Sequence, residues 1–127
     1  MAGFLTAEQR ERLLHNGRRS AATESHDPKP VVKLFTPDGS ATWLLTELDP
    51  NNPDIAFGLC DLGFGEPELG TVWLSELQRC RGPHGLSIEV DRNFTALAAI
   101  SVYANAARDA GRITEDVDDY QQTFRFS

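Results

Sequence analysis

The fold is decided by one central stretch, PVVKLFTPDGSATWLLTELDP at residues 30–50, followed by NNPDIAFGLCDLGFGEPELGTVWLSEL at residues 51–77. Short runs of β-branched and aromatic residues alternate here with turns rich in Pro, Gly and Asn. This pattern is typical of antiparallel strands joined by tight connections. The clearest hairpin lies at residues 31–48, around the turn at residues 36–39, whose Pro and Gly suit turn geometry.

Three more strands are expected after this hairpin. Residues 55–62 and 71–74 are apolar runs bounded by turn residues, and at residues 86–90 the side chains alternate between apolar and polar. Alternation of this kind predicts a half-buried strand.

Helices are expected before and after the strands in the sequence. Thr6 and Gln9 have capping-box spacing, which predicts a helix at residues 7–15 that ends at Asn16-Gly17. Ser75 is a candidate cap for a helical turn at residues 75–81, and Thr95 for the longest helix, at residues 96–110. The sequence therefore predicts an α+β fold in which an antiparallel sheet of about four to five strands at residues 30–92 is covered by the N-terminal helix and the longer C-terminal helix. We expect one domain at residues 1–113 and a C-terminal tail at residues 114–127 that is acidic and then aromatic.

The charge distribution is the best functional indication in the sequence. The 127 residues carry 19 acids and 12 Lys or Arg, a net charge of -7, which disfavours direct binding to nucleic acid. Eight acids and no base lie between Lys33 and Arg79, whereas Arg18, Arg19 and Lys29 make the N-terminal third locally basic. A protein partner with a basic surface fits this distribution. The alternative is that negative charge only keeps the protein in solution.

Strand alternation indicates which side chains would form a recognition surface. In the second strand, Trp43, Leu45, Glu47 and Asp49 are expected on one face. Aromatic residues framed by carboxylates are typical of interfaces. The residues that we predict to bind a partner are Trp43, Glu47, Asp49, Asp61, Glu66, Glu68 and Trp73. The alternative is that the aromatic residues are core residues, with the acids at strand ends.

No motif for catalysis, metal binding or cofactor binding is present. The three histidines have no nucleophile motif beside them, and Cys60 and Cys80 have no paired spacing for zinc or redox chemistry. We therefore expect no catalytic residue, no metal and no cofactor, and an enzyme is the less favoured interpretation. The N-terminus lacks the apolar segment of a signal peptide or membrane span, so we expect a cytoplasmic protein.

Four phrases carry a resemblance to a known family: LTAEQRERLLHNG near the N-terminus, the hairpin at residues 30–50, AFGLCDLGFGEPELGTVWLSEL, and ISVYANAARDAGRI. Together they resemble an uncharacterised family of small proteins, classed as a domain of unknown function and encoded largely on bacterial plasmids and other mobile elements. The resemblance covers residues 5–113. It implies a biological setting and no site residues.

The implied setting and the acidic stretch together predict an anti-defence protein, similar to anti-CRISPR or anti-restriction inhibitors. It would act by protein–protein binding, with an acidic surface that blocks the basic nucleic-acid-binding groove of a CRISPR or restriction complex. The alternatives are an accessory binding module for plasmid maintenance or transfer and, less favoured, a small hydrolase-type enzyme. A homo-oligomer that covers the aromatic face with a second copy also stays open.

Overall fold

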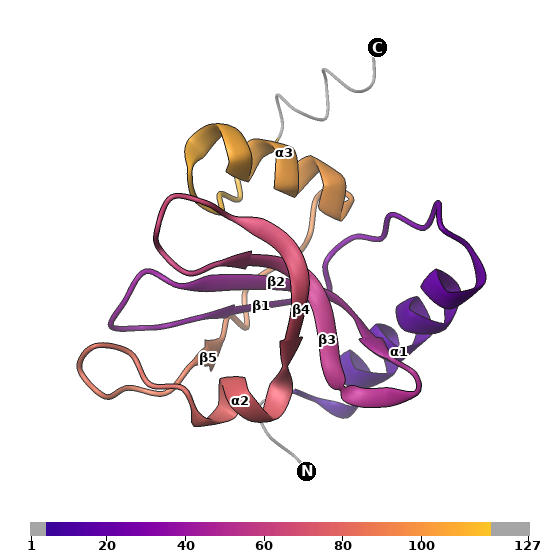
Figure 1. The fold of residues 1–127 in the computed structure, drawn as a ribbon, viewed down its shortest axis with the longest axis horizontal. Coiled ribbons are helices and arrows are strands. Elements are labelled where there is room, and N and C mark those ends of the chain that lie inside the picture. The colour runs from indigo at the N-terminus through magenta and orange to yellow at the C-terminus, as the bar shows by residue number, and fades with distance from the viewer. Residues whose placement is uncertain (1–4, 118–127) are drawn as a thin grey trace.

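The computed structural model of the chain describes residues 5–117, which form an α+β fold around a five-stranded antiparallel sheet (Figure 1). This confirms the predicted fold class. The elements in chain order are α1 (Ala7–Ala22), β1 (Val32–Phe35), β2 (Thr42–Asp49), β3 (Asn52–Asp61), β4 (Glu68–Trp73), α2 (Leu74–Arg79), β5 (Glu89–Val90) and α3 (Ile100–Ala110).

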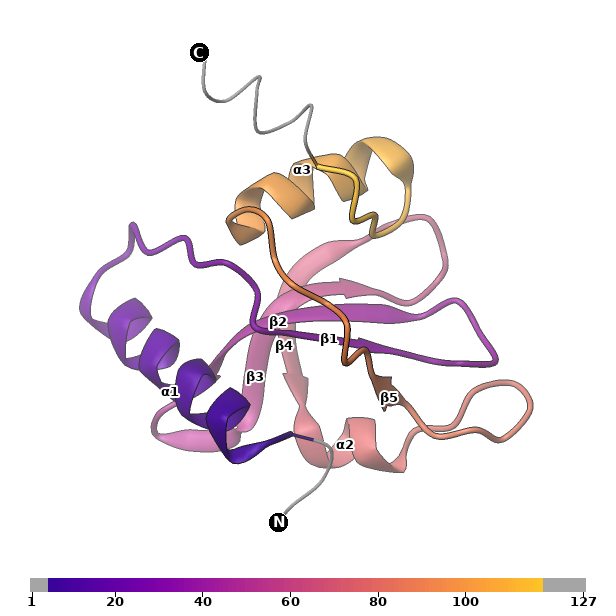
Figure 2. The same cartoon turned by 180° about the vertical axis from the view of Figure 1, so that it is seen from behind.

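The sheet has the strand order β4-β3-β2-β1-β5. The first four strands are successive antiparallel neighbours, and the chain then returns so that β5 pairs with β1. α3 lies above the sheet and α2 below it, as both views of the ribbon show (Figures 1 and 2). The sheet therefore has a separate hydrophobic core on each face.

The two cores contain different residues of the same strands. On one face, Leu34, Trp43 and Leu45 pack with Leu74 and Leu77 of α2. On the other face, Leu44 and Leu59 pack beneath α3, whose Tyr103 is 1% exposed. Burial of apolar side chains on both faces is the main stabilising contribution to such a three-layer arrangement.

A β-bulge at Thr46 interrupts β2 and changes which of the side chains that follow it point to each face of the sheet. Leu45 pairs with Gly58 and Glu47 with Phe57, so Thr46 is the extra residue. Its hydroxyl donates to the Phe57 carbonyl oxygen at 3.2 Å, which satisfies this fully buried group. The bulge reverses the alternation that follows it. The prediction that Trp43 and Leu45 share a face with Glu47 is therefore wrong.

α1 is longer than predicted because its glycine is a packing residue and not a stop. The capping box at Thr6 and Gln9 is confirmed, but the helix continues through Gly17 to Ala22. A Cβ at Gly17 would lie 1.8 Å from the Leu48 carbonyl oxygen, so only glycine allows α1 to approach β2 this closely. Asn16 Nδ2 donates to the Thr46 carbonyl oxygen at 2.9 Å beside this contact.

Carboxylates that are distant in the sequence bind the first turns of α2 and α3. Asp54 accepts hydrogen bonds from the Ser75 backbone N–H at 3.0 Å and from the Ser75 hydroxyl at 2.7 Å. Asp27 accepts from the Ser101 N–H at 3.1 Å in the same way. The predicted caps are wrong, because α2 begins after Trp73 and α3 begins only at Ile100, after Ala99. At 11 residues α3 is shorter than α1, which has 16, although its end at Gly111 agrees with the prediction.

The predicted strand at residues 86–90 is reduced to β5 because Asp38 binds the loop that precedes it. Asp38 Oδ2 accepts from the backbone N–H groups of His84 at 2.7 Å and Leu86 at 3.2 Å. Desolvation raises the pKa of Asp38, but these donors and the charge of His84 outweigh it, so the pKa lies below the ordinary 3.8. The other strands differ from prediction at their ends, since β3 and β4 both begin three residues earlier.

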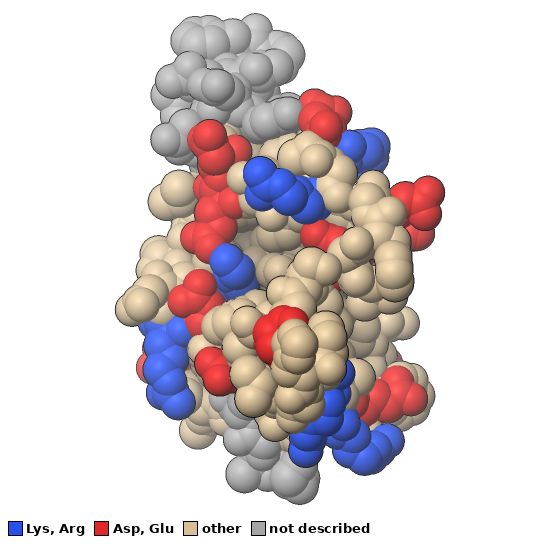
Figure 3. Space-filling model, turned by 90° about the vertical axis from the view of Figure 1, so that its left-hand side faces the viewer, with Lys and Arg blue, Asp and Glu red and all other residues tan. Residues whose placement is uncertain are grey.

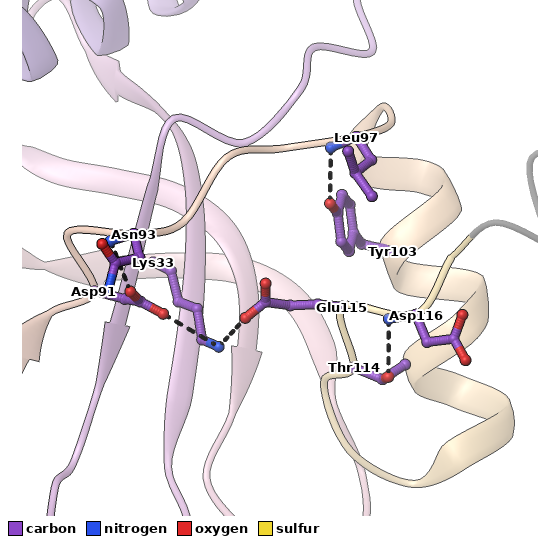
Figure 4. Close-up of polar contacts among 8 residues, drawn as sticks. All are labelled: Lys33, Asp91, Asn93, Leu97, Tyr103, Thr114, Glu115 and Asp116. Carbon is purple, nitrogen blue, oxygen red and sulfur yellow. Dashed lines mark hydrogen bonds and ion pairs between the residues drawn. The ribbon is translucent and has the colours of Figure 1, made fainter.

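The segment after α3 contacts the sheet through Lys33 of β1. Lys33 Nζ lies between the carboxylates of Asp91, at 3.7 Å, and Glu115, with which it forms an ion pair and hydrogen bond (Figure 4). The Tyr103 hydroxyl accepts from the Leu97 N–H at 3.0 Å in the same region. Val117 is fully buried, so the first residues of the predicted tail belong to the packed structure. The rest of that tail lies outside the described residues.

Within residues 5–117, no helix has both the length and the apolar character that crossing a membrane requires.

Candidate partner-binding surface

The residues predicted to bind a partner do not form one surface. Trp43, Glu66 and Glu68 line a cavity of ≈ 400 Å³ beside the β3–β4 connection. Glu47 and Asp49 line a second cavity, of ≈ 310 Å³, between α1 and the sheet. Asp61 and Trp73 line neither of these two cavities. The bulge at Thr46 explains the separation, because it sends Trp43 and Glu47 to opposite faces.

The cavity beside the β3–β4 connection combines exposed apolar side chains with carboxylates. Phe64 is 83% exposed, Leu62 59% and Leu69 44%, and Glu66 and Glu68 are also exposed. We call these five residues, Leu62, Phe64, Glu66, Glu68 and Leu69, the β3–β4 surface. An apolar centre with a charged rim is the composition of a protein interface, and exposed apolar patches mark binding sites.

Two left-handed glycines shape the connection that carries Phe64. Gly63 has a φ of 89° and Gly65 a φ of 87°. A Cβ at Gly63 would also lie 2.2 Å from Ser40 Oγ, so the connection lies close against the β1–β2 turn. The two neighbours of Phe64 therefore have a backbone conformation that only glycine adopts readily.

Trp43 and Cys60 form the floor of this cavity. Trp43, Cys60 and Glu68 are cross-strand neighbours in one row over β2, β3 and β4. Trp43 is only 4% exposed because its ring also belongs to the core beneath α2. Burial, with a smaller contribution from the Glu68 carboxylate, raises the pKa of the Cys60 thiol to about 11. The thiol is therefore protonated at neutral pH and acts as part of an apolar floor.

The second cavity is a cleft in which a carboxylate is already bound within the chain. Ser20 of α1 donates its hydroxyl hydrogen to Glu47 Oε1 at 2.8 Å. Glu47, Phe57 and Thr71 are cross-strand neighbours on the face that α3 covers elsewhere. Asp49 Oδ1 accepts from the Asn51 N–H at 2.8 Å, within its own turn. Both acids thus have structural partners, whereas Glu66 and Glu68 form no side-chain hydrogen bond with any other residue of the range 5–117.

Asp61 is a structural carboxylate. It is 3% exposed, its Oδ1 accepts from the Gly63 N–H at 2.9 Å, and its Oδ2 accepts from the Ile113 N–H at 2.9 Å. It therefore joins the end of β3 to the segment after α3. Trp73 is 45% exposed and pairs with Ile55 at the far end of β4 from Glu68.

At the end of the molecule that carries the β1–β2 and β3–β4 connections, the charges do not form one continuous acidic surface (Figure 3). Viewed from the end where the β1–β2 and β3–β4 connections lie, the surface is largely uncharged, with acidic and basic side chains interspersed (Figure 3). Lys33, which directly precedes the base-free stretch, forms ion pairs with Asp91 and Glu115 from later segments of the chain. The β3–β4 surface is a local acidic and apolar patch.

Sequence reasoning missed the three apolar members of this surface, Leu62, Phe64 and Leu69. The signal that would have found them is the Gly-Phe-Gly triplet at residues 63–65, because an aromatic residue between two glycines in a turn has no strand to pack into. Among residues 5–117, no group of three or more His, Cys, Asp or Glu side chains is arranged to hold a metal ion.

Comparison with known proteins gives one match. Residues 4–114 match the model of a family described as "Protein of unknown function (DUF2958)". No curated protein and no solved structure matches the chain.

Proposed function

Because the chain belongs to the DUF2958 family, whose function is unknown, we propose a role from its own surface: it is a binding module whose β3–β4 surface contacts a basic protein partner. The observation that carries this proposal is the group of Leu62, Phe64 and Leu69, exposed beside Glu66 and Glu68 at a cavity of ≈ 400 Å³. Exposed apolar groups give the contact its affinity, and carboxylates select partners with Lys or Arg.

The partner class follows from charge and chemistry. The net charge of -7 repels nucleic acid and attracts basic proteins. A groove that holds nucleic acid is lined with Lys and Arg and often has aromatic side chains on which bases stack. The negative charges of Glu66 and Glu68 complement the positive charges of such a groove. The Phe64 ring is suited to stack on the aromatic side chains of the groove. The chain is suited to occupy the groove in place of nucleic acid.

The sequence resemblance implies that the protein is encoded on plasmids and other mobile elements. This setting favours one class of partner over others. Such elements benefit from proteins that block restriction or CRISPR complexes, and both kinds of complex bind nucleic acid in basic grooves. We therefore assign the chain to anti-defence inhibitors that act by binding. The support is this setting, together with the local acidic and apolar patch.

The test is an affinity pull-down from lysates of a bacterium that carries CRISPR and restriction systems, after nuclease treatment. The informative variant is Glu66→Lys/Glu68→Lys, because both side chains are exposed and neither forms a hydrogen bond within the part of the chain that the structure describes. The matched control is Glu24→Lys/Glu89→Lys, which changes the charge equally at exposed positions outside the β3–β4 surface. Asp61 stays unchanged in both, since it binds two backbone N–H groups.

We expect the wild type and the control to recover a defence complex, and the Glu66→Lys/Glu68→Lys variant to lose it. Recovery that is unchanged in that variant would refute the assigned surface. Recovery only of proteins encoded by the same mobile element would refute the anti-defence role and favour a maintenance or transfer module.

A further inference from the structure

A third cavity, lined mainly by cationic side chains, lies against α1 at the end of the molecule opposite the β3–β4 surface. It has a volume of ≈ 390 Å³, and its lining residues are Glu11, Arg12, His15, Asn16, Arg18, Pro28 and Lys29. We call it the α1 pocket. One wall is the face of α1 that carries residues 11–18, and the other is the linker between α1 and β1. α1 and the β3–β4 connection lie at opposite ends of the sheet in both ribbon views (Figures 1 and 2).

The continuation of α1 past Gly17 creates this pocket. Had the helix ended at Asn16, as the sequence predicts, Arg18 would lie in a connecting segment. In the folded chain, Arg18 follows Glu11 by seven residues, which is about two helical turns, so both lie on one side of α1. Helical spacing also places His15 between them.

The α1 pocket is positively charged in a negatively charged protein. Arg12, Arg18 and Lys29 contribute three cationic groups, against the single carboxylate of Glu11. Glu11 pairs with Arg18 at 3.4 Å, but both side chains are more than half exposed, so the pair is weak and does not remove the positive field. The acids of the β3–β4 surface lie at the far end of the sheet, where salt screens their effect on the pocket.

Both walls of the pocket are held by contacts outside it. α1 is fixed to β2 by the hydrogen bond from Asn16 to Thr46 and by the close approach of Gly17 to Leu48. The linker is fixed to α3, because the Ile100 N–H donates to the Pro28 carbonyl oxygen at 2.8 Å and Asp27 binds Ser101. The backbone that carries Lys29 is thus held opposite α1 before any ligand arrives, which reduces the entropy lost on binding.

We propose that the α1 pocket binds the phosphate group of a small phosphorylated molecule. The planar guanidinium groups of Arg12 and Arg18 suit two oxygens of a phosphate, and the Lys29 ammonium adds a point charge from the opposite wall. The volume, ≈ 390 Å³, holds a phosphate with a small organic group attached. This site is independent of the proposed protein-binding role, because it shares no residue with the β3–β4 surface.

The experiment is an NMR titration of the backbone amides with inorganic phosphate and with pyrophosphate, at fixed ionic strength. The test variant is Arg12→Gln/Lys29→Gln. The matched control is Arg92→Gln/Arg112→Gln, which removes the same charge from exposed positions outside the pocket. All four side chains are exposed, and the amide spectrum itself shows whether each variant is folded.

We expect saturable shifts confined to the backbone amides of α1 and of Lys29, with pyrophosphate binding more tightly than phosphate. The Arg12→Gln/Lys29→Gln variant should weaken the affinity about tenfold or more, since two charge-assisted contacts are lost, and the control about twofold or less. Shifts that do not saturate, or that the test variant leaves unchanged, would overturn the proposal. A short single-stranded oligonucleotide that binds more tightly than pyrophosphate would also overturn it, in favour of a nucleic-acid contact.

Discussion

Replacement of Gly17 by alanine should destabilise the protein, although the same change in an exposed helix position stabilises. Alanine is favoured over glycine in a helix interior by ~1 kcal/mol. Here, however, the new Cβ would lie 1.8 Å from the Leu48 carbonyl oxygen, 3.0 Å from the Leu48 carbonyl carbon and 3.2 Å from Pro50 Cδ. Two of these atoms belong to the backbone of β2, which is fixed in the sheet, so α1 itself must move.

The magnitude follows from three contributions. Overpacking of a tight contact costs ~1–3 kcal/mol. Displacement of α1 also breaks the hydrogen bond from Asn16 to Thr46, which contributes ~1 kcal/mol and leaves a buried carbonyl oxygen without its donor. After subtraction of the gain in helix propensity, we expect Gly17→Ala to lower the free energy of unfolding by ~1–3 kcal/mol.

Urea unfolding followed by tryptophan fluorescence measures this change, because Trp43 is buried and reports loss of the core beneath α2. The pair Arg19→Gly and Arg19→Ala, at an exposed position of the same helix, gives the intrinsic difference between the two residues. Gly17→Ala should lower the urea midpoint, whereas Arg19→Ala should lie above Arg19→Gly. If Gly17→Ala raised the midpoint by the amount that the Arg19 pair predicts, the contact between α1 and β2 would be refuted.

Three further predictions follow from buried or desolvated groups. At pH 8 iodoacetamide should label the exposed Cys80 and leave Cys60 unmodified in the native protein, because burial raises the pKa of Cys60 to about 11; equal labelling would contradict this. Asp38 has a lowered pKa, so its carboxylate stabilises the fold above its ordinary pKa of 3.8, and this contribution is lost as the pH falls through the lower folded value. Urea unfolding at pH 7 and at about pH 2.5 should therefore show a larger loss of stability in the wild type than in Asp38→Asn, and equal losses would count against it. Asp61→Asn should lower the free energy of unfolding by ~1–3 kcal/mol, because an amide cannot accept from two backbone donors through both of its atoms; unchanged stability would show that these bonds contribute nothing.

The sequence predicted those elements that local chemistry determines. The hairpin of β1 and β2, the capping box at Thr6 and the end of α3 at Gly111 all depend on residues within a few positions of one another. The starts of α2 and α3 could not be predicted in the same way. Their first turns are bound by Asp54 and Asp27, which lie 21 and 74 residues from the serines that they contact.

Two other errors have tertiary causes. Asn16-Gly17 has the composition of a helix stop, yet Gly17 is needed inside α1 because β2 lies against it. Thr46 fits an alternating strand, yet the β-bulge at this position reverses the facing of Glu47. The bulge divides the predicted binding surface, because it sends Trp43 and Glu47 to opposite faces of the sheet.

Occupation of a nucleic-acid-binding groove by the β3–β4 surface is tested most directly by competition. The measurement is the fluorescence anisotropy of a labelled nucleic acid bound to the defence complex that the pull-down recovers, with the protein added in increasing amounts. We predict that the wild type releases the nucleic acid and that Glu66→Lys/Glu68→Lys requires at least about tenfold more protein for the same release. Binding of the wild type to a complex that keeps its nucleic acid, or equal release by the charge-reversed variant, would contradict the proposed function.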